Sequence, residues 1–157
     1  MNISDELESI ARSLSESGIA YALCGGLAVA VHGYPRATQD IDILIRESDL
    51  NRAIALLGKK GYSISAGIIP FDVGKESESR VYRISKPTGE DLLTLDLVLV
   101  SRILEDVWEA RETFQVEDYE IAVVSLSGLK KMKRLSGRPQ DLVDIERLED
   151  LERNGES

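Results

Sequence analysis

The chain has 157 residues, of which 43% are hydrophobic and 30% are charged, a composition typical of one globular domain with a substantial core. Its formal net charge of −9 argues against a broadly basic surface wrapped around nucleic acid and leaves only a local basic patch open. The single cysteine excludes an internal disulfide. Because we find no signal peptide and no apolar run long enough to span a bilayer, we expect a cytoplasmic protein without a membrane partner.

The N-terminal part of the chain predicts two helices around a buried strand. The first helix is expected to begin near Ser4, where acidic residues suit the helix dipole, and to end at Gly18. The apolar segment 19–24 is typical of a buried strand, and residues 27–32 are typical of a short helix. A loop over residues 33–38 then leads to the next strand.

A second strand and a covering helix are expected next. Residues 40–45 are an apolar run that begins with two aspartates, which predicts a strand. The following amphipathic helix begins at Ser48 and ends at Gly61, and it would cover one face of the sheet. Residues 62–79 predict one or two weak strands joined by an exposed loop.

The middle of the chain predicts a hairpin. Residues 80–85 alternate like a half-buried strand, and residues 92–100 are the most strand-like run in the protein. A turn over residues 87–90 would join them as antiparallel neighbours. A helix over residues 103–108 and a final strand over residues 119–124 are expected after them.

The last section, residues 127–151, contains two helical patterns divided near Gly137. Glycine suits the end of one helix, and Pro139 suits the first position of the next. The whole succession of helices and strands predicts an α/β (α+β) fold.

Two glycines and two aspartates suggest a functional site. Side chains alternate along a strand, so Asp40 and Asp42 share a face, where paired carboxylates either lie in open solvent or bind a cation. Oxygen ligands indicate a hard ion such as Mg²⁺. Gly25 and Gly26 open the short helix after a strand, and their backbone N–H groups can approach a phosphate there. Taken alone, an exposed strand face explains the aspartate pair as well.

Asp96 is the third acidic residue of interest, because it stands inside the aliphatic run of residues 92–100. An ionised carboxylate in such a run is costly to bury, by several kcal/mol, unless a positive group neutralises it. No adjacent side chain in the run can pair with it. We therefore interpret Asp96 as a third metal ligand beside the aspartate pair, rather than as an edge-strand residue that faces water.

Other conspicuous residues have simpler interpretations. Cys24 is more typical of a small buried side chain than of a reactive thiol. His32, the only histidine, has no second metal-type ligand at a useful spacing, so a structural or surface role is favoured over catalysis. Trp108 belongs to the apolar stripe of its helix. Three basic residues suit a solvated helix face near a helix C-terminus: Lys130, Lys131 and Arg134.

The glycine pair at a helix start, followed by Asp-x-Asp on the next strand, resembles the nucleotidyltransferase superfamily of DNA polymerase β-like proteins. The later strand aspartate completes the carboxylate trio of that superfamily. The C-terminal segment KRLSGRPQDLVDIERL is similar to the signature of nucleotidyltransferase toxins related to the abortive-infection protein AbiEii. The chain is short for that branch, whose members often carry a larger helical C-terminal part, so recognition of the acceptor can differ or need a partner.

The resemblance implies a mixed twisted β-sheet flanked by helices, within one nucleotidyltransferase-like domain over residues 1–157. The core of this domain would span about residues 19–124, and its C-terminal helical part about residues 125–153. One or two Mg²⁺ ions would be held by the three expected catalytic carboxylates: Asp40, Asp42 and Asp96. Six residues would bind the nucleotide: Gly25, Gly26, Arg36, Thr38, Lys133 and Arg138.

The implied reaction moves a nucleoside monophosphate from a nucleoside triphosphate such as ATP to a hydroxyl acceptor and releases pyrophosphate. The metal and Asp96 would activate the acceptor, which is an RNA end, a protein or a small molecule. Asp141 or Asp144 would orient a basic residue or help to activate the acceptor, although a helix surface explains them equally well. A toxin-like role would bring an antitoxin or another protein as a partner.

Three alternatives are weighed against this interpretation. A phosphatase of the haloacid dehalogenase type places its Asp-x-Asp at the end of an apolar strand, whereas here the apolar residues follow the pair. A calcium-binding EF-hand loop needs glycine where Ile45 stands. The serious alternative is a non-catalytic member that binds a nucleotide or a protein, as half of a toxin–antitoxin pair. The intact aspartate trio argues against it, because nothing structural demands three acids.

Overall fold

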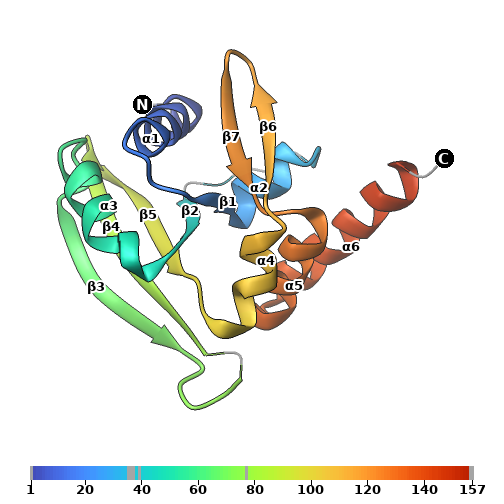
Figure 1. The fold of residues 1–157 in the computed structure, drawn as a ribbon. Helices are drawn as coiled ribbons and strands as arrows, with labels where there is room; N and C mark the ends of the chain where they lie inside the picture. The colour runs from blue at the N-terminus through green and yellow to red at the C-terminus, as the bar shows by residue number, and fades with distance from the viewer. Residues whose placement is uncertain (1, 35–37, 39, 77, 156–157) are drawn as a thin grey trace.

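The computed structural model describes residues 2–34, 38, 40–76 and 78–155, and its ribbon is drawn in Figure 1. Within these residues a mixed sheet of seven strands has the order β3-β4-β5-β2-β1-β7-β6. The bounds of the strands are β1 Ala22–Cys24, β2 Asp40–Ile45, β3 Ile64–Phe71, β4 Ser79–Thr88, β5 Asp91–Leu99, β6 Glu112–Val116 and β7 Tyr119–Val123. β2 pairs in parallel with β5, and β1 in parallel with β7, while the other pairs are antiparallel.

Helices flank this sheet on two sides (Figure 1). Their bounds are α1 Ile3–Glu16, α2 Gly25–Val31, α3 Leu50–Gly58, α4 Glu105–Glu109, α5 Leu126–Ser136 and α6 Pro139–Gly155, with short 3-10 helices at Glu47–Asp49 and Arg102–Leu104. α1 contacts α3 and β7, whereas α5 contacts α2, α4 and α6. Figure 1 shows α6 running outward to the C-terminus. The predicted fold class, with its mixed sheet, flanking helices and C-terminal helices, is confirmed.

The central strands sort their side chains by alternation. In β5 the odd-numbered leucines are buried: Leu93, Leu95, Leu97 and Leu99. Ile41, Ile43 and Ile45 of β2 are buried in the same way. Each such side chain contributes about 1.5–3 kcal/mol when it leaves water, which fixes the register of both strands. The alternate positions of the two strands, which carry the three predicted aspartates, therefore lie on the other face of the sheet.

The first helix begins slightly earlier than the sequence predicted. Ile3 is its first residue, and the N-cap is Asn2, whose side-chain oxygen accepts a hydrogen bond from the Ser4 N–H at 2.8 Å. The helix packs through Leu7, Ile10 and other apolar residues of one stripe, as expected. Its predicted end is close to the observed one, since Gly18 follows with φ +71°.

Two strands differ from the sequence prediction. β3 is a continuous strand at one edge of the sheet, longer than the weak pieces that were expected. β6 was not predicted, because its segment ETFQV is mostly exposed and its turn to β7 carries Glu117 and Asp118 in place of a glycine signal. Glu117 nevertheless adopts φ +52° in that turn.

No helix in the described part of the chain is both long enough and apolar enough to cross a bilayer.

Candidate functional site

A cavity of about 490 Å³ opens where β2, β4 and β5 meet α5. Phe71, Asp72 and Ser79, from the tip of the β3–β4 hairpin, also line it, so this tip reaches the same hollow as α5. The cavity wall includes eight of the nine residues predicted from the sequence: Gly25, Gly26, Thr38, Asp40, Asp42, Asp96, Lys133 and Arg138. The ninth, Arg36, lies outside the described residues.

Sheet register brings the aspartates to one place. Asp42 on β2 stands opposite Asp96 on β5 in the parallel pairing, so their side chains point to the same face. Asp40 precedes Asp42 by two residues on the same strand and shares this face. Two segments far apart in the chain thus place three carboxylates along one wall of the cavity.

Gly25 allows the close approach of Asp42 to the start of α2. A Cβ atom at Gly25 would lie 2.1 Å from Oδ2 of Asp42, and the residue has φ +68°. Only glycine satisfies both conditions without displacing the carboxylate. Glycine at this position therefore serves the aspartate directly, in addition to leaving the backbone open to a ligand.

The surroundings of Asp42 disfavour its charge. Burial, followed by the repulsion of Asp96 and Asp40, raises the pKa of Asp42 to about 7, while Lys133 and Arg138 act in the opposite direction. The basic side chains of the site therefore do not fully neutralise its carboxylates. A hard divalent cation would supply that charge, and carboxylate oxygens are the ligands that it prefers.

Arg83 is a site residue that the sequence analysis missed. It lies on β4 opposite Asp96, with Nε 2.8 Å from Oδ1 and Nη2 3.0 Å from Oδ2. The sequence analysis considered only the side chains beside Asp96 in its own run, and the partner lies on the neighbouring strand. The predicted hairpin turn was also too long, because β4 runs to Thr88 and the chain reverses at residues 89–90 rather than over 87–90. The longer turn would have placed Val81 opposite Asp96.

Lys133 and Arg138 share an acidic partner. The Lys133 ammonium is buried and lies 3.4 Å from Asp141 Oδ1 and 3.0 Å from Asp144 Oδ2. Arg138 donates from Nε to Asp141 at 2.9 Å and from its backbone N–H to the same oxygen at 3.2 Å. Burial would raise the pKa of Asp141, but hydrogen bonds from Arg138 and Ser136 hold it below its usual range. These ion pairs join α5 to the start of α6.

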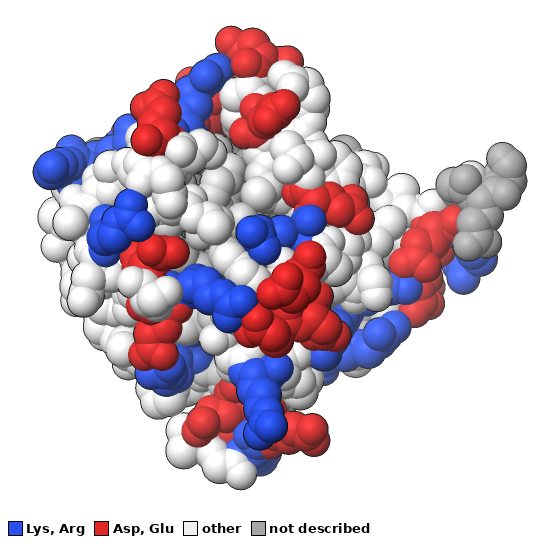
Figure 2. Space-filling model, viewed as in Figure 1, with Lys and Arg blue, Asp and Glu red and all other residues white. Residues whose placement is uncertain are grey.

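The remaining basic residues of α5 are paired at the surface. Lys130 lies 2.6 Å from Glu152, Lys131 lies 2.8 Å from Asp106, and Arg134 lies 3.6 Å from Glu149. Figure 2 likewise shows acidic and basic side chains interspersed over the face in view. The local basic patch that the sequence left open is therefore neutralised by neighbouring acids.

The surroundings of Cys24, His32 and Trp108 bear on the simpler interpretations given to these residues. Cys24 is buried, and burial raises the pKa of its thiol. His32 donates from Nε2 to the carbonyl of Val124 at 2.8 Å and meets Phe114 edge to face. Trp108 is 4% exposed, and the Arg111 guanidinium lies 4.1 Å above its ring. The predictions of a buried cysteine and a core tryptophan are confirmed, and the contacts of His32 agree with the expected structural or surface role.

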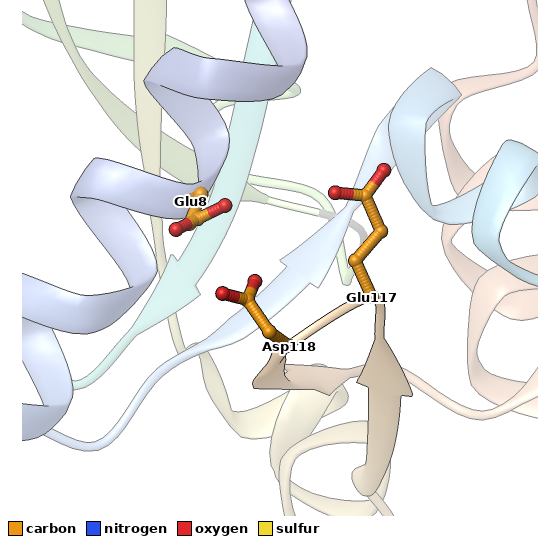
Figure 3. Close-up of side chains that lie close together, drawn as sticks. All are labelled: Glu8, Glu117 and Asp118. Carbon is orange, nitrogen blue, oxygen red and sulfur yellow. The ribbon is translucent and has the colours of Figure 1, made fainter.

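A second acidic trio lies elsewhere, between α1 and the β6–β7 turn (Figure 3). It consists of Glu8, Glu117 and Asp118, which can each offer an oxygen within 4.8 Å of the others. Arg12 lies 2.9 Å from Glu8 and 3.5 Å from Asp118, and the group stands outside the cavity wall. The contacts of Arg12 link this turn to α1.

The carboxylates of the cavity trio are spaced more widely than those of this second trio. Within the described part of the chain, the second trio is the only acidic group whose oxygens gather so closely, and the cavity aspartates do not. Like charges repel in the absence of a cation, and Asp96 forms an ion pair with Arg83. The three cavity carboxylates fit a divalent ion by donor chemistry, by shared face and by their deficit of positive charge.

Comparison with known proteins relates the chain to nucleotidyltransferases. A protein family described as "Uncharacterised nucleotidyltransferase" matches residues 1–128. No curated protein matches the chain significantly.

Three solved structures share the fold. The lincosamide antibiotic adenylyltransferase LnuA, solved with lincomycin bound, has 20% identity and a TM-score of 0.64 over 94% of this chain and 96% of its own. TM1012 from Thermotoga maritima, a nucleotidyltransferase candidate, has 13% identity and a TM-score of 0.65 over 94% and 92%. ANT(2")-Ia, in complex with adenylyl-2"-tobramycin, has 15% identity and a TM-score of 0.59 over 94% and 91%.

Proposed function

The chain belongs to the family of uncharacterised nucleotidyltransferases, and we propose that it moves a nucleoside monophosphate from a nucleoside triphosphate to a hydroxyl acceptor with release of pyrophosphate. The observation that carries the proposal is the pairing of Asp42 with Asp96 in one cavity, beside a glycine turn that only Gly25 can make. No role in packing calls for two adjacent carboxylates there, since their repulsion opposes folding.

Asp40, Asp42 and Asp96 would hold one or two Mg²⁺ ions. A bound ion would neutralise charge on the phosphoryl oxygens and on the leaving pyrophosphate. We assign to Asp96 the uptake of the acceptor's proton, as the acceptor oxygen bonds to the α-phosphorus and the bond to the pyrophosphate oxygen breaks. Asp40 and Asp42 serve as ligands only, whereas Asp96 is both ligand and base, and positioning supplies much of the remaining rate.

The cationic wall of the cavity would face the triphosphate. Arg138 suits this task because its side chain is 73% exposed while Asp141, nearly fully buried, fixes its Nε. Lys133 is buried and paired twice, so we assign it to holding α5 and α6 together rather than to direct contact with phosphate. Gly25, Gly26 and Thr38 line the cavity beside the carboxylates and would contact the phosphates through backbone or hydroxyl groups.

A small hydroxyl-bearing molecule is the acceptor that we favour. The cavity combines the polar groups above with an apolar wall that includes Val81, Val98, Met132 and Leu135. LnuA and ANT(2")-Ia, which share the fold, were solved with lincomycin and with an adenylylated tobramycin respectively. An RNA end has less support, since Lys130, Lys131 and Arg134 are all paired with acids. The AbiEii-like toxin role and an antitoxin partner stay predictions from the sequence.

The direct test is incubation with each labelled nucleoside triphosphate, Mg²⁺ and a panel of hydroxyl compounds, followed by measurement of pyrophosphate and of the labelled product. We expect labelled acceptor and one pyrophosphate per transfer, and we expect neither product with Asp96→Asn. Nucleotide binding without pyrophosphate, over a panel that also includes RNA and cell extract, would instead support the non-catalytic binding protein.

A further inference from the structure

Arg83 is the cation that most directly opposes the carboxylate trio. Its guanidinium makes a two-bonded pair with Asp96, and its pKa is raised chiefly by that hydrogen bond and also by the charges of Asp40 and Asp42. The pair is unequal in exposure, because the Arg83 side chain is 41% exposed whereas that of Asp96 is 13% exposed. Both residues line the cavity.

This pairing conflicts with the use of Asp96 as a metal ligand. Both carboxylate oxygens accept hydrogen bonds from Arg83, so an ion that takes Asp96 must weaken or replace at least one of them. The guanidinium also repels an incoming divalent cation at short range. Metal and Arg83 therefore compete for the same carboxylate.

The conflict has a chemical solution within the cavity. Arginine stays charged at all ordinary pH values, so a guanidinium released from Asp96 needs another anion or water. Its planar set of donors matches phosphate oxygens, and its partial exposure gives it room to turn. A triphosphate in the same cavity would provide the anion.

We propose that Arg83 is an exchangeable counter-ion, which neutralises Asp96 until a divalent cation takes that carboxylate and which then binds the phosphates of the nucleotide. The proposal rests on the function proposed above and adds a coupling to it. Metal binding frees Arg83 for the nucleotide, and nucleotide binding keeps Arg83 away from the metal ligand. By linkage, each ligand strengthens the binding of the other.

The test measures binding, not turnover, for Arg83→Gln and for a matched control. Arg80→Gln is the control, because Arg80 lies on the same strand, is 44% exposed and pairs with Glu47 outside the cavity wall. Calorimetry at pH 8 would give the affinity for Mn²⁺ alone, and then the affinity for a non-hydrolysable nucleoside triphosphate analogue with Mn²⁺ present.

The expected signature is a pair of opposite changes. Arg83→Gln should bind Mn²⁺ alone about tenfold more tightly than the parent and bind the analogue about tenfold more weakly, as loss of a charge-assisted pair implies. Arg80→Gln should change neither affinity. A fixed structural support for Asp96 would instead weaken both, so weaker or unchanged Mn²⁺ binding overturns the proposal.

Two further variants keep this outcome separate from failure of the proposed function. Arg83→Lys retains the charge but not the two-bonded fork, so it should change both affinities in the same directions by smaller factors, and it serves if Arg83→Gln does not fold. Asp42→Asn should abolish Mn²⁺ binding. If neither the parent nor any Arg83 variant binds Mn²⁺, the metal site itself is wrong and both proposals fail; if only the Arg83 effects are missing, the counter-ion proposal fails alone.

Discussion

The protein carries two acidic trios that differ in the spacing of their carboxylates and in the elements that hold them. Glu8, Glu117 and Asp118 gather closely at the surface between α1 and the β6–β7 turn, with Arg12 beside them (Figure 3). The trio in the cavity is more widely spread, yet burial and mutual repulsion raise the pKa of Asp42 to about 7. The function proposed above assigns the metal to the cavity trio, although the carboxylates of the surface trio lie closer together. Shared face, burial of Asp42 and unmet negative charge are the features on which that assignment depends.

The difference arises from how each trio is held. The surface trio joins a helix and a turn, where water screens the charges and the side chains can adjust. The cavity trio stands on two paired strands of the central sheet, backed by a buried leucine face and by Gly25. Rigid elements hold groups in place even when their charges repel. Such a local loss of stability from charge repulsion is expected at a site where a bound ligand relieves the repulsion.

The largest contrast is expected in nucleotide transfer. Asp42→Asn removes one proposed metal ligand and should lower the transfer rate about a thousandfold, because charge stabilisation in the transition state is lost. Asp118→Asn makes the same chemical change in the surface trio and should leave the rate unchanged. Release of labelled pyrophosphate measures both. Equal rates for the two variants would remove the distinction between the trios.

The next contrast concerns folding stability in the presence of a chelator. The folded-state pKa of Asp42, about 7, lies above its ordinary value of 3.8, so the folded protein binds the proton more tightly than the unfolded chain does. Stability contributed by the protonated carboxyl is present below pH 4 and is lost as the pH rises through 7. At pH 8, Asp42→Asn should therefore be more stable than the parent, by about 2 kcal/mol.

Denaturant unfolding at pH 5 and pH 8 measures this effect, with Glu8→Gln as the control from the surface trio. The gain from Asp42→Asn should be larger at pH 8 than at pH 5, while Glu8→Gln should change the free energy of unfolding by less than about 0.5 kcal/mol at either pH. An Asp42→Asn variant less stable than its parent at pH 8 would mean that this carboxylate supports the fold.

The two trios also show what the sequence could and could not predict. Asp40 and Asp42 share a face by strand alternation alone, so their pairing followed from local pattern. The placement of Asp96 beside them needed the parallel pairing of β2 with β5, which no local pattern determines. The cost of burying Asp96 pointed to a positive partner, and the resemblance to a family suggested metal. Arg83 stayed hidden because a shift of the hairpin turn changes every cross-strand pair.

Similar reasons account for the other successes and failures. The leucines of β5 and the division at Gly137, where φ is +66°, were predicted because strand period and helix-end chemistry are local. β6 was missed because an exposed strand has little apolar signal. Asp141 or Asp144 was expected to orient a basic residue, and both pair with Lys133. The sequence could not name that partner, because the two acids belong to the next helix and only the packing of α5 on α6 brings them together.

A smaller contrast tests the backbone beneath each trio, starting with the cavity. Gly25→Ala puts a Cβ atom 2.1 Å from Asp42 Oδ2, at a backbone φ of +68°. We expect a loss of about 2 kcal/mol in the free energy of unfolding, from the left-handed backbone and the displaced carboxylate together. Metal affinity should fall as well, whereas Gly18→Ala, with φ +71° and open space around it, should lose stability alone. Calorimetry with Mn²⁺ separates the two effects.

The smallest expected effect concerns the surface trio, where a substitution should raise the free energy of unfolding rather than lower it. Glu117 holds φ +52° without being glycine, and its carboxylate lies among two others. Glu117→Gly should relieve the backbone and stabilise the protein by about 0.5–1 kcal/mol, less than the full left-handed penalty because glycine gains freedom in the unfolded chain. Glu117→Ala removes only the charge and should gain a few tenths of a kcal/mol at most. If both variants gain equally in thermal unfolding, repulsion rather than backbone conformation limits the surface trio, and the two trios are closer in kind than their burial indicates.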